Sequence, residues 1–429
     1  MSAVIALYGA GGAPFHHAAI FARAGHRVRF VFPQDVHAGA LEGFDIFVMP
    51  GGGYRAMLGQ LEPLGREGAI ALREWVASGG MYIGCCAGSY DAAVAAPSFL
   101  EACPAQAEMC LLDARVWNHS DTEWLGLQSP GIGVLRAETV APDHPVMAGM
   151  PETFEIAHYN GPLFRGAEPL ARVLGATDRF TPSEAALGGS AEGALIDSAG
   201  AAGAACVVAG EHGDGRVVLF GSHPEFGFGI TMEDAQAPAR MLLNAVDWQL
   251  EASGAPERPA VTLASDDVEP TGDEPARVAD LADAIRDRTE KIRARGGDAV
   301  WLRPEYAMSF FGLRPGEIWM RSLDAIDRHA RTAADRTPGV EPAVLAFRPP
   351  AECELDGGYH GVVALLEQSV ELLDRALAEW DDDLGGPPTT PYEHMLTSPY
   401  HHVAGSYLAA AGRVTAAALL CEAHERVVA

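Results

Sequence analysis

The chain has 429 residues, of which 48% are hydrophobic, so it is long and apolar enough to form two or three globular domains. Its formal net charge of −28 argues against binding to a nucleic-acid backbone or to an anionic membrane surface, since both require clustered Lys and Arg. We expect neither a membrane-spanning run nor a signal peptide, which favours a cytoplasmic protein.

The seven cysteines are scattered along the chain, at positions 85, 86, 103, 110, 206, 353 and 421. Their spacing matches neither a disulfide framework nor a zinc site, so we expect reduced thiols and no bound metal. No cofactor is expected either, because Pro14 interrupts the dinucleotide-binding pattern that Gly9 and Gly11 begin. His16 and His17 follow this glycine run, and a structural role is the simpler interpretation of both.

Short apolar runs alternate with helical patterns through the first part of the chain. The predicted strands are residues 4–8, 28–32, 44–49 and a run from 81, and the predicted helices are residues 15–24 and 66–78. A hairpin of strands at 205–209 and 216–220 follows, and then a helix at 239–250. This alternation predicts a mostly parallel sheet covered on both faces, with the functional site beyond the carboxyl ends of the strands.

Three later regions have different patterns. Residues 108–209 show short alternating runs, which indicate β structure and loops inserted on the site side of the sheet. Residues 252–276 lose all periodicity and form an acidic, proline-containing linker, whereas 277–429 show helical spacing. We therefore predict an α/β domain at 1–251, a linker at 252–276 and an α-helical bundle at 277–429.

The stretch 84–88 reads Gly-Cys-Cys-Ala-Gly and leads from a strand into an alanine-rich helical segment. A nucleophile on a sharp strand-to-helix turn needs small flanking residues, because the turn brings neighbouring backbone close. Cys86 has Gly84 and Gly88 at these positions, whereas an isoleucine would crowd the turn if Cys85 were the nucleophile. The helix start also favours a thiolate at Cys86. The alternative is that both cysteines are small core residues.

A candidate base and its carboxylate partner lie far downstream, at the end of the strand predicted at 216–220. His223 and Glu225 are two residues apart, so one strand end can supply both groups. A cysteine nucleophile needs such a base, and the base needs an orienting group. An isolated histidine is more often structural, but the cysteine turn, the His-x-Glu pair and an early glycine loop together favour nucleophilic catalysis.

Residues 1–250 resemble the class I glutamine amidotransferase-like fold, and within it the subgroup found as the N-terminal domain of some biotin–protein ligases. The residues that carry the resemblance are Pro50-Gly51-Gly52-Gly53, the stretch 84–90, Tyr159-Asn160-Gly161-Pro162 and His223-Pro224-Glu225. The resemblance implies a flavodoxin-like, doubly wound and mostly parallel sheet. It also implies that Cys86 is the nucleophile, His223 the general base and Glu225 the carboxylate that orients the base.

The resemblance further implies an oxyanion hole and a substrate pocket. The backbone amides of Gly51 or Gly52 and of Ala87 would hold the oxyanion. The residues expected to face the substrate are Tyr90, His158, Tyr159 and Asn160. Tyr90 departs from the family pattern, because glutaminases of this class carry Gln four residues after the nucleophile. We therefore expect a substrate other than plain glutamine.

The leading hypothesis is a cysteine-dependent amidohydrolase or amidotransferase-like enzyme acting on an amide bond. Its expected substrate is a small-molecule or peptide amide, and the helical region is a candidate surface for a separate protein partner. The alternative is a non-catalytic module that binds a ligand or partner, which the missing glutamine-pocket residue favours. A cysteine-peptidase-like protein ranks last, because Ala87 stands where such proteins place a histidine directly after the cysteine.

Overall fold

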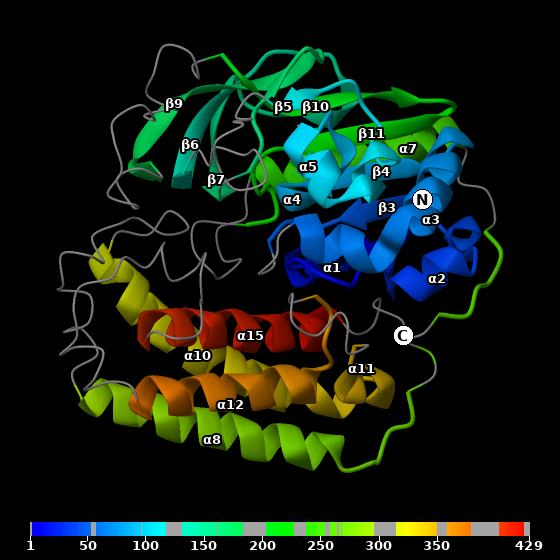
Figure 1. Ribbon diagram of the computed structural model, residues 1–429. Coiled ribbons are helices and arrows are strands. Elements are labelled where there is room, and N and C mark those ends of the chain that lie inside the picture. The colour runs from blue at the N-terminus through cyan, green and yellow to red at the C-terminus, as the bar shows by residue number, and fades with distance from the viewer. Residues whose placement is uncertain are drawn as a thin grey trace.

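A computed structural model shows the three-dimensional structure of the chain. It describes residues 2–52, 57–95, 97–116, 131–159, 161–182, 203–226, 237–253, 258–263, 266, 268–295, 315–349, 358–378 and 403–423. The first part of the chain forms an α/β unit around one twisted sheet, and the last part forms a layer of long helices below it (Figure 1).

Five parallel neighbours form one half of the sheet, in the order β2-β1-β3-β4-β11. Their bounds are Arg27–Val31, Val4–Tyr8, Ile46–Met49, Met81–Cys85 and Gly215–Phe220. The strands are buried along almost their whole length, as their near-continuous apolar sequences predict for a sheet covered on both faces. Because β4 and β11 run parallel, Cys85 pairs with Phe220 and both strands end at one edge.

The other half of the sheet is antiparallel and continues in the order β10-β9-β6-β7. These strands are Ala205–His212, Pro169–Pro182, Gly131–Thr139 and Thr153–Tyr159, and two short strands, β5 (Arg115–Val116) and β8 (Phe164–Arg165), pair beside them. The predicted insertion of β structure between 108 and 209 is therefore confirmed. An isolated bridge between Ala157 and His223 brings the end of β7 to the edge where β4 and β11 end.

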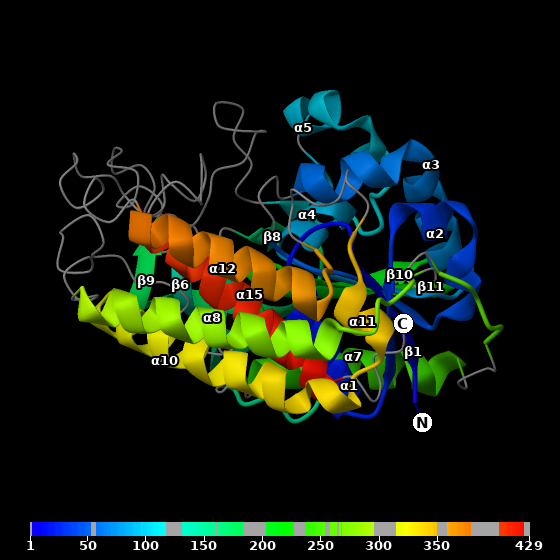
Figure 2. The same cartoon turned by 90° about the horizontal axis from the view of Figure 1, so that it is seen from below.

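The helices of the α/β unit lie on both faces of the sheet (Figures 1 and 2). They are α1 (Phe15–Arg23), α2 (Pro33–His37), α3 (Met57–Ala77), α4 (Ala87–Ala92), α5 (Pro97–Ala102) and α7 (Ala237–Ser253). The span of α3 is interrupted at Gly65, whose φ of +64° and ψ of 179° are not helical, so it consists of two helical segments that meet at a kink. The second segment covers the helix predicted at 66–78, and the first, from Met57, was not predicted.

The predicted fold class, a mostly parallel α/β sheet followed by a helical bundle, is confirmed. The long C-terminal helices are α8 (Glu274–Ala294), α10 (Pro315–Arg336), α12 (Val362–Ala378) and α15 (Val403–Ala423), with the short α11 (Pro342–Ala346) at one end. Figure 2 shows the four long helices side by side, with α8 and α15 each in contact with both α10 and α12.

Helix α15 lies between the α/β unit and the other bundle helices, because it also packs on α1 (Figure 1). Its sequence is rich in alanine and leucine all round, and residues 416–421 are all buried. Helix α1 is buried from Phe15 to Ala22 for the same reason, since it lies between the sheet and α15. A helix that is apolar on every side is typical of such an interior position.

The predicted linker is shorter in the structure, because helices extend into both of its ends. Helix α7 continues to Ser253, and α8 begins at Glu274 with Pro275 in its first turn. Proline is favoured at this position, where its missing N–H costs no hydrogen bond, so it starts the helix rather than marking a linker. Within the linker, the Val261 carbonyl accepts a hydrogen bond from the Arg29 guanidinium, which also pairs with Asp266.

An aromatic cluster joins the helical region to β2 and α1. The Tyr359 ring stacks on Phe30, with ring centroids 3.7 Å apart, and on Phe347, with centroids 4.7 Å apart. The amides of Gly358 and Tyr359 donate hydrogen bonds to the carbonyls of Gly12 and Gly9. The early glycine run therefore binds a distant segment of its own chain.

Candidate active site

Cys86 occupies a strained turn between β4 and α4. It is the only non-glycine residue with a positive φ among the described residues, at φ +47° and ψ −107°. The two flanking glycines are required by close packing. A Cβ at Gly84 would lie 2.5 Å from the Gly88 carbonyl oxygen, and a Cβ at Gly88 would lie 2.2 Å from the Met49 carbonyl oxygen. Strained backbone of this kind concentrates at functional sites.

The adjacent cysteines have different surroundings. The Cys86 Sγ–H donates to the Tyr159 carbonyl at 3.3 Å, and 6% of Cys86 is exposed. Cys85 is fully buried, and its Sγ lies 3.3 Å from His17 Nε2. Ser89, which was not among the predicted site residues, stabilises the turn from β4 into α4. Its hydroxyl donates to the carbonyls of Gly84 and Phe220.

His223 and Glu225 form a buried pair beside Cys86. The His223 Nδ1 lies 2.7 Å from Glu225 Oε1, and the His223 amide donates to the Ala157 carbonyl. His223 Nε2 has no hydrogen-bond partner among the described residues, which leaves this atom available for proton transfer. The His223 ring also stacks on Phe226, with centroids 4.6 Å apart. The structure thus brings Cys86, His223 and Glu225 together; their catalytic roles stay a prediction.

Gly51 lies close to both Cys86 and His223. A Cβ on this glycine would lie 2.6 Å from Cys86 Cβ and 2.7 Å from His223 Cε1. The backbone amides of Gly51, Gly52 and Ala87 make no backbone hydrogen bond outside regular elements in the described part of the chain. Amides at a glycine loop and at a helix start beside a nucleophile are the donors that an oxyanion hole needs, and this role stays a prediction here.

The charges of the buried pair stabilise one another. Burial lowers the pKa of His223, but the Glu225 carboxylate and the Cys86 side chain outweigh burial and raise this pKa to about 10. Burial raises the pKa of Glu225, but His17 and His223 outweigh it and lower this pKa to about 2. An imidazolium–carboxylate pair is therefore expected at neutral pH beside Cys86.

This ion pair predicts a pH-dependent stability. Because the pKa of His223 is raised from 6.5 to about 10, its contribution is complete below pH 6.5 and is lost as the pH rises through about 10. The free energy of unfolding should fall by about 1.4 kcal/mol per pH unit in this window. We expect urea unfolding of chelator-treated protein to show this slope in the wild type and a weaker slope in Glu225→Gln. Equal slopes of unfolding free energy against pH in the wild type and in Glu225→Gln would contradict the pairing of His223 with Glu225.

The four residues predicted to face a substrate differ in their burial and in their contacts. Tyr90 is buried on α4, and the ring of the half-buried Tyr159 lies 6.5 Å from the His223 ring, centroid to centroid. His158 is also buried, with its Nδ1 3.0 Å from Ser222 Oγ, and burial lowers its pKa to about 3. Asn160 lies outside the described residues. A substrate contact by any of these four residues stays a prediction.

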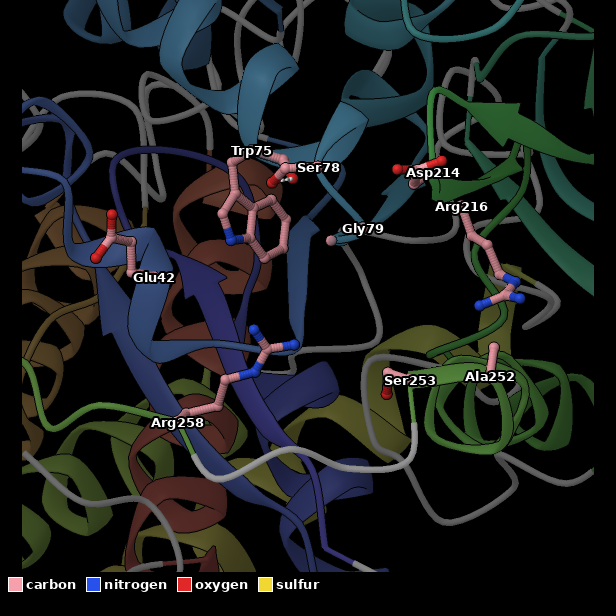
Figure 3. A pocket seen from close by; sticks show the side chains of 10 residues that line it. Glu42, Trp75, Ser78, Gly79, Asp214, Arg216, Ala252, Ser253 and Arg258 are labelled. Carbon is pink, nitrogen blue, oxygen red and sulfur yellow. Dashed lines mark hydrogen bonds between the residues drawn. The ribbon is translucent and has the colours of Figure 1, made fainter.

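A cavity of about 480 Å³ lies at the opposite edge of the sheet, beside the amino ends of β4 and β11. Figure 3 shows its lining, which includes Trp75, Arg216 and Arg258. The Arg258 Nε–H donates to Asp45, and the Arg216 guanidinium donates to Gln249 and lies over the Trp248 ring. Because the chain itself already engages both guanidinium groups, this cavity is a weaker candidate for catalysis than the edge with Cys86.

The family model of the biotin-protein ligase N terminus matches residues 42–99. This segment contains the glycine loop and the cysteine turn, so the predicted resemblance is confirmed for it. No curated protein matches the chain. Among the helices in the described ranges, none is sufficiently long and apolar to cross a membrane.

Several solved structures are similar to part of the chain. A ThuA-like protein from Bacteroides uniformis is 14% identical, with a TM-score of 0.35, covering 58% of this chain and 90% of its own. PurLQS from Thermotoga maritima is 14% identical, with a TM-score of 0.34, and coverage of 58% and 99%. The glutaminase domain of Trypanosoma brucei CTPS, solved with acivicin, is 16% identical, with a TM-score of 0.31, and coverage of 60% and 98%. Similarity at this level supports no inference about activity.

Proposed function

We propose that the protein is a cysteine-dependent amidohydrolase or amidotransferase-like enzyme that acts on an amide bond through Cys86, His223 and Glu225. The observation that supports this most strongly is the positive φ of Cys86 at a strand-to-helix turn, directly beside a buried His–Glu pair. A cysteine that served only the core would need neither the strained backbone nor the neighbouring ion pair.

In the proposed reaction, the Cys86 thiolate attacks the carbonyl carbon of an amide. The amides of Gly51 or Gly52 and of Ala87 stabilise the oxyanion, which contributes about 3 kcal/mol per donor in comparable sites. The protonated His223 gives its proton to the leaving amine from Nε2. The neutral imidazole then takes a proton from the water that hydrolyses the thioester, or from an amine that accepts the acyl group, while Glu225 holds the ring through Nδ1.

The proposed substrate is a small-molecule or peptide amide other than free glutamine. Tyr90 supports this choice, because it replaces the glutamine that shapes the pocket in typical glutaminases of the resembled class. Tyr90 is buried on α4, four residues after Cys86. A separate protein partner that binds the helical region is part of the same proposal.

A non-catalytic ligand- or partner-binding module is the second candidate. The low exposure of Cys86 and the hydrogen bond from its thiol to the Tyr159 carbonyl favour it, since both restrict access to the sulfur. In this alternative, the same three side chains hold a ligand or stabilise the fold without turnover.

Alkylation of Cys86 by an iodoacetamide probe near neutral pH distinguishes these candidates. Cys110 is the exposed thiol among the described cysteines, so Cys110→Ser removes background labelling, and peptide mapping locates the remainder. We expect rapid labelling at Cys86, slowed about tenfold or more in His223→Ala, because the imidazolium no longer stabilises the thiolate. Cys85→Ala should be labelled at Cys86 as rapidly as the protein with Cys85 intact.

Labelling at Cys86 that is no faster than at the other buried thiols, or that is unchanged in His223→Ala, would contradict the catalytic proposal. That result would favour the binding module. A rapid reaction would be followed by assays with a panel of amides, with Cys86→Ala as the inactive reference.

A further inference from the structure

Three metal-binding donor atoms converge at the carboxyl end of β4. They are His17 Nε2 from α1, Cys85 Sγ at the end of β4 and Glu225 Oε2 beyond the end of β11. His17 Nε2 lies 3.3 Å from Cys85 Sγ and 3.7 Å from Glu225 Oε2, and all three atoms lie within 4.8 Å of one another. All three side chains are fully buried.

Glu225 divides its two oxygens between this cluster and the proposed catalytic site. Its Oε1 is bound to His223, whereas Oε2 has no hydrogen-bond partner among the described residues. Oε2 lies 3.7 Å from His17 Nε2 and groups with the Cys85 thiol, so Glu225 can pair with His223 through one oxygen and still offer the other to an ion.

We propose that His17, Cys85 and Glu225 bind one divalent ion of the zinc class. Thiolate, imidazole and carboxylate together select such an ion over Mg²⁺ or Ca²⁺, which prefer oxygen ligands alone. Tetrahedral zinc places such donor atoms ~3.3–3.6 Å apart, close to the two separations given above. The thiolate and the carboxylate also carry two negative charges, which balance the charge of the ion in this buried position.

The proposed site differs from the catalytic one in its ligands and in its access. The Cys86 thiol donates to the Tyr159 carbonyl and is not one of the proposed ligands, and Glu225 presents a different oxygen to each site. With three protein ligands the ion keeps a fourth position open. Because His17, Cys85 and Glu225 are fully buried, the ion is incorporated as the protein folds and exchanges slowly afterwards.

The zinc content of the full-length chain tests this site. The protein is produced in zinc-supplemented medium, washed free of loose metal and measured by plasma mass spectrometry. We expect about one zinc per chain in the wild type, in Cys86→Ala and in Cys206→Ala, the last being a matched control at another fully buried cysteine. Cys85→Ala and His17→Gln each remove a ligand and should lower the zinc content at least about tenfold.

Three results would overturn the proposal: a wild type without zinc, zinc retained in Cys85→Ala, or zinc lost in Cys86→Ala. The last would place the ion at the nucleophile instead. Circular dichroism shows whether Cys85→Ala and His17→Gln fold. If they do not, X-ray absorption of the zinc-loaded wild type identifies the atoms that bind the zinc. One sulfur neighbour with nitrogen and oxygen neighbours is expected, whereas none, or two or more, rejects the site. Each result is independent of amide turnover.

Discussion

Gly51→Ala should reduce alkylation of Cys86, and any amide turnover, by about 100-fold or more. The added methyl group would lie 2.6 Å from Cys86 Cβ, 2.7 Å from His223 Cε1 and 3.0 Å from the Cys85 carbonyl oxygen. None of these neighbours can move freely, because Cys86 is fixed in a strained turn and His223 is held by Glu225. Misplacement of reacting groups by about 1 Å typically costs this much in rate.

The experiment compares labelling rates well below the thermal midpoint of each protein, since the clash also lowers stability. Gly412→Ala in α15 is the matched control, because a Cβ there meets no atom within 4 Å. This control should label Cys86 at the wild-type rate. A folded Gly51→Ala protein that labels as fast as the wild type would show that the spacing between Cys86 and His223 does not govern reactivity.

Tyr359→Ala should lower the free energy of unfolding by about 3–5 kcal/mol, the usual cost of truncating a large buried aromatic side chain. Tyr359 is only 2% exposed and stacks between Phe30 of the α/β unit and Phe347 of the helical region. The substitution removes both contacts but keeps the amide that donates to Gly9. Urea or thermal unfolding followed by circular dichroism measures the loss.

Arg286→Ala is the comparison for this prediction. Arg286 forms an exposed ion pair with Asp283 one turn earlier on α8, so its loss should change the free energy of unfolding by less than about 0.5 kcal/mol. We also expect the wild type to unfold in one transition, because a single cluster of buried residues includes both the sheet and the bundle. A first transition confined to the helices, with no effect of Tyr359→Ala on the second, would contradict this.

Much of the α/β unit could be predicted from local patterns. The strand at Val4–Tyr8 has the predicted bounds, and the cysteine turn appears where its glycines indicated. These features are readable because apolar runs and small residues act over a few positions. The start of α8 was less predictable, since Pro275 stands in its first turn instead of in a linker, and the short helical segment before the kink in α3 was not predicted.

Long-range packing explains what the sequence could not reveal. His17 and Cys85 are 68 positions apart, and only the docking of α1 against β4 brings them together. Similarly, the helical pattern of α15 indicated a helix but not that α1 would cover its remaining face. No local signal marks Tyr359 as a partner of Phe30, because either ring would fit equally well in a core of its own domain.

The contact of α15 with α1 has a consequence for the order of folding. Helix α1 leaves the ribosome well before α15, and its outer face is covered only after Val403–Ala423 has been synthesised. During that interval the apolar surface of α1 and β2 is open to solvent. Contacts of such long sequence separation slow folding and expose surface that aggregates. The nascent chain should therefore depend on chaperones until Val403–Ala423 has been synthesised.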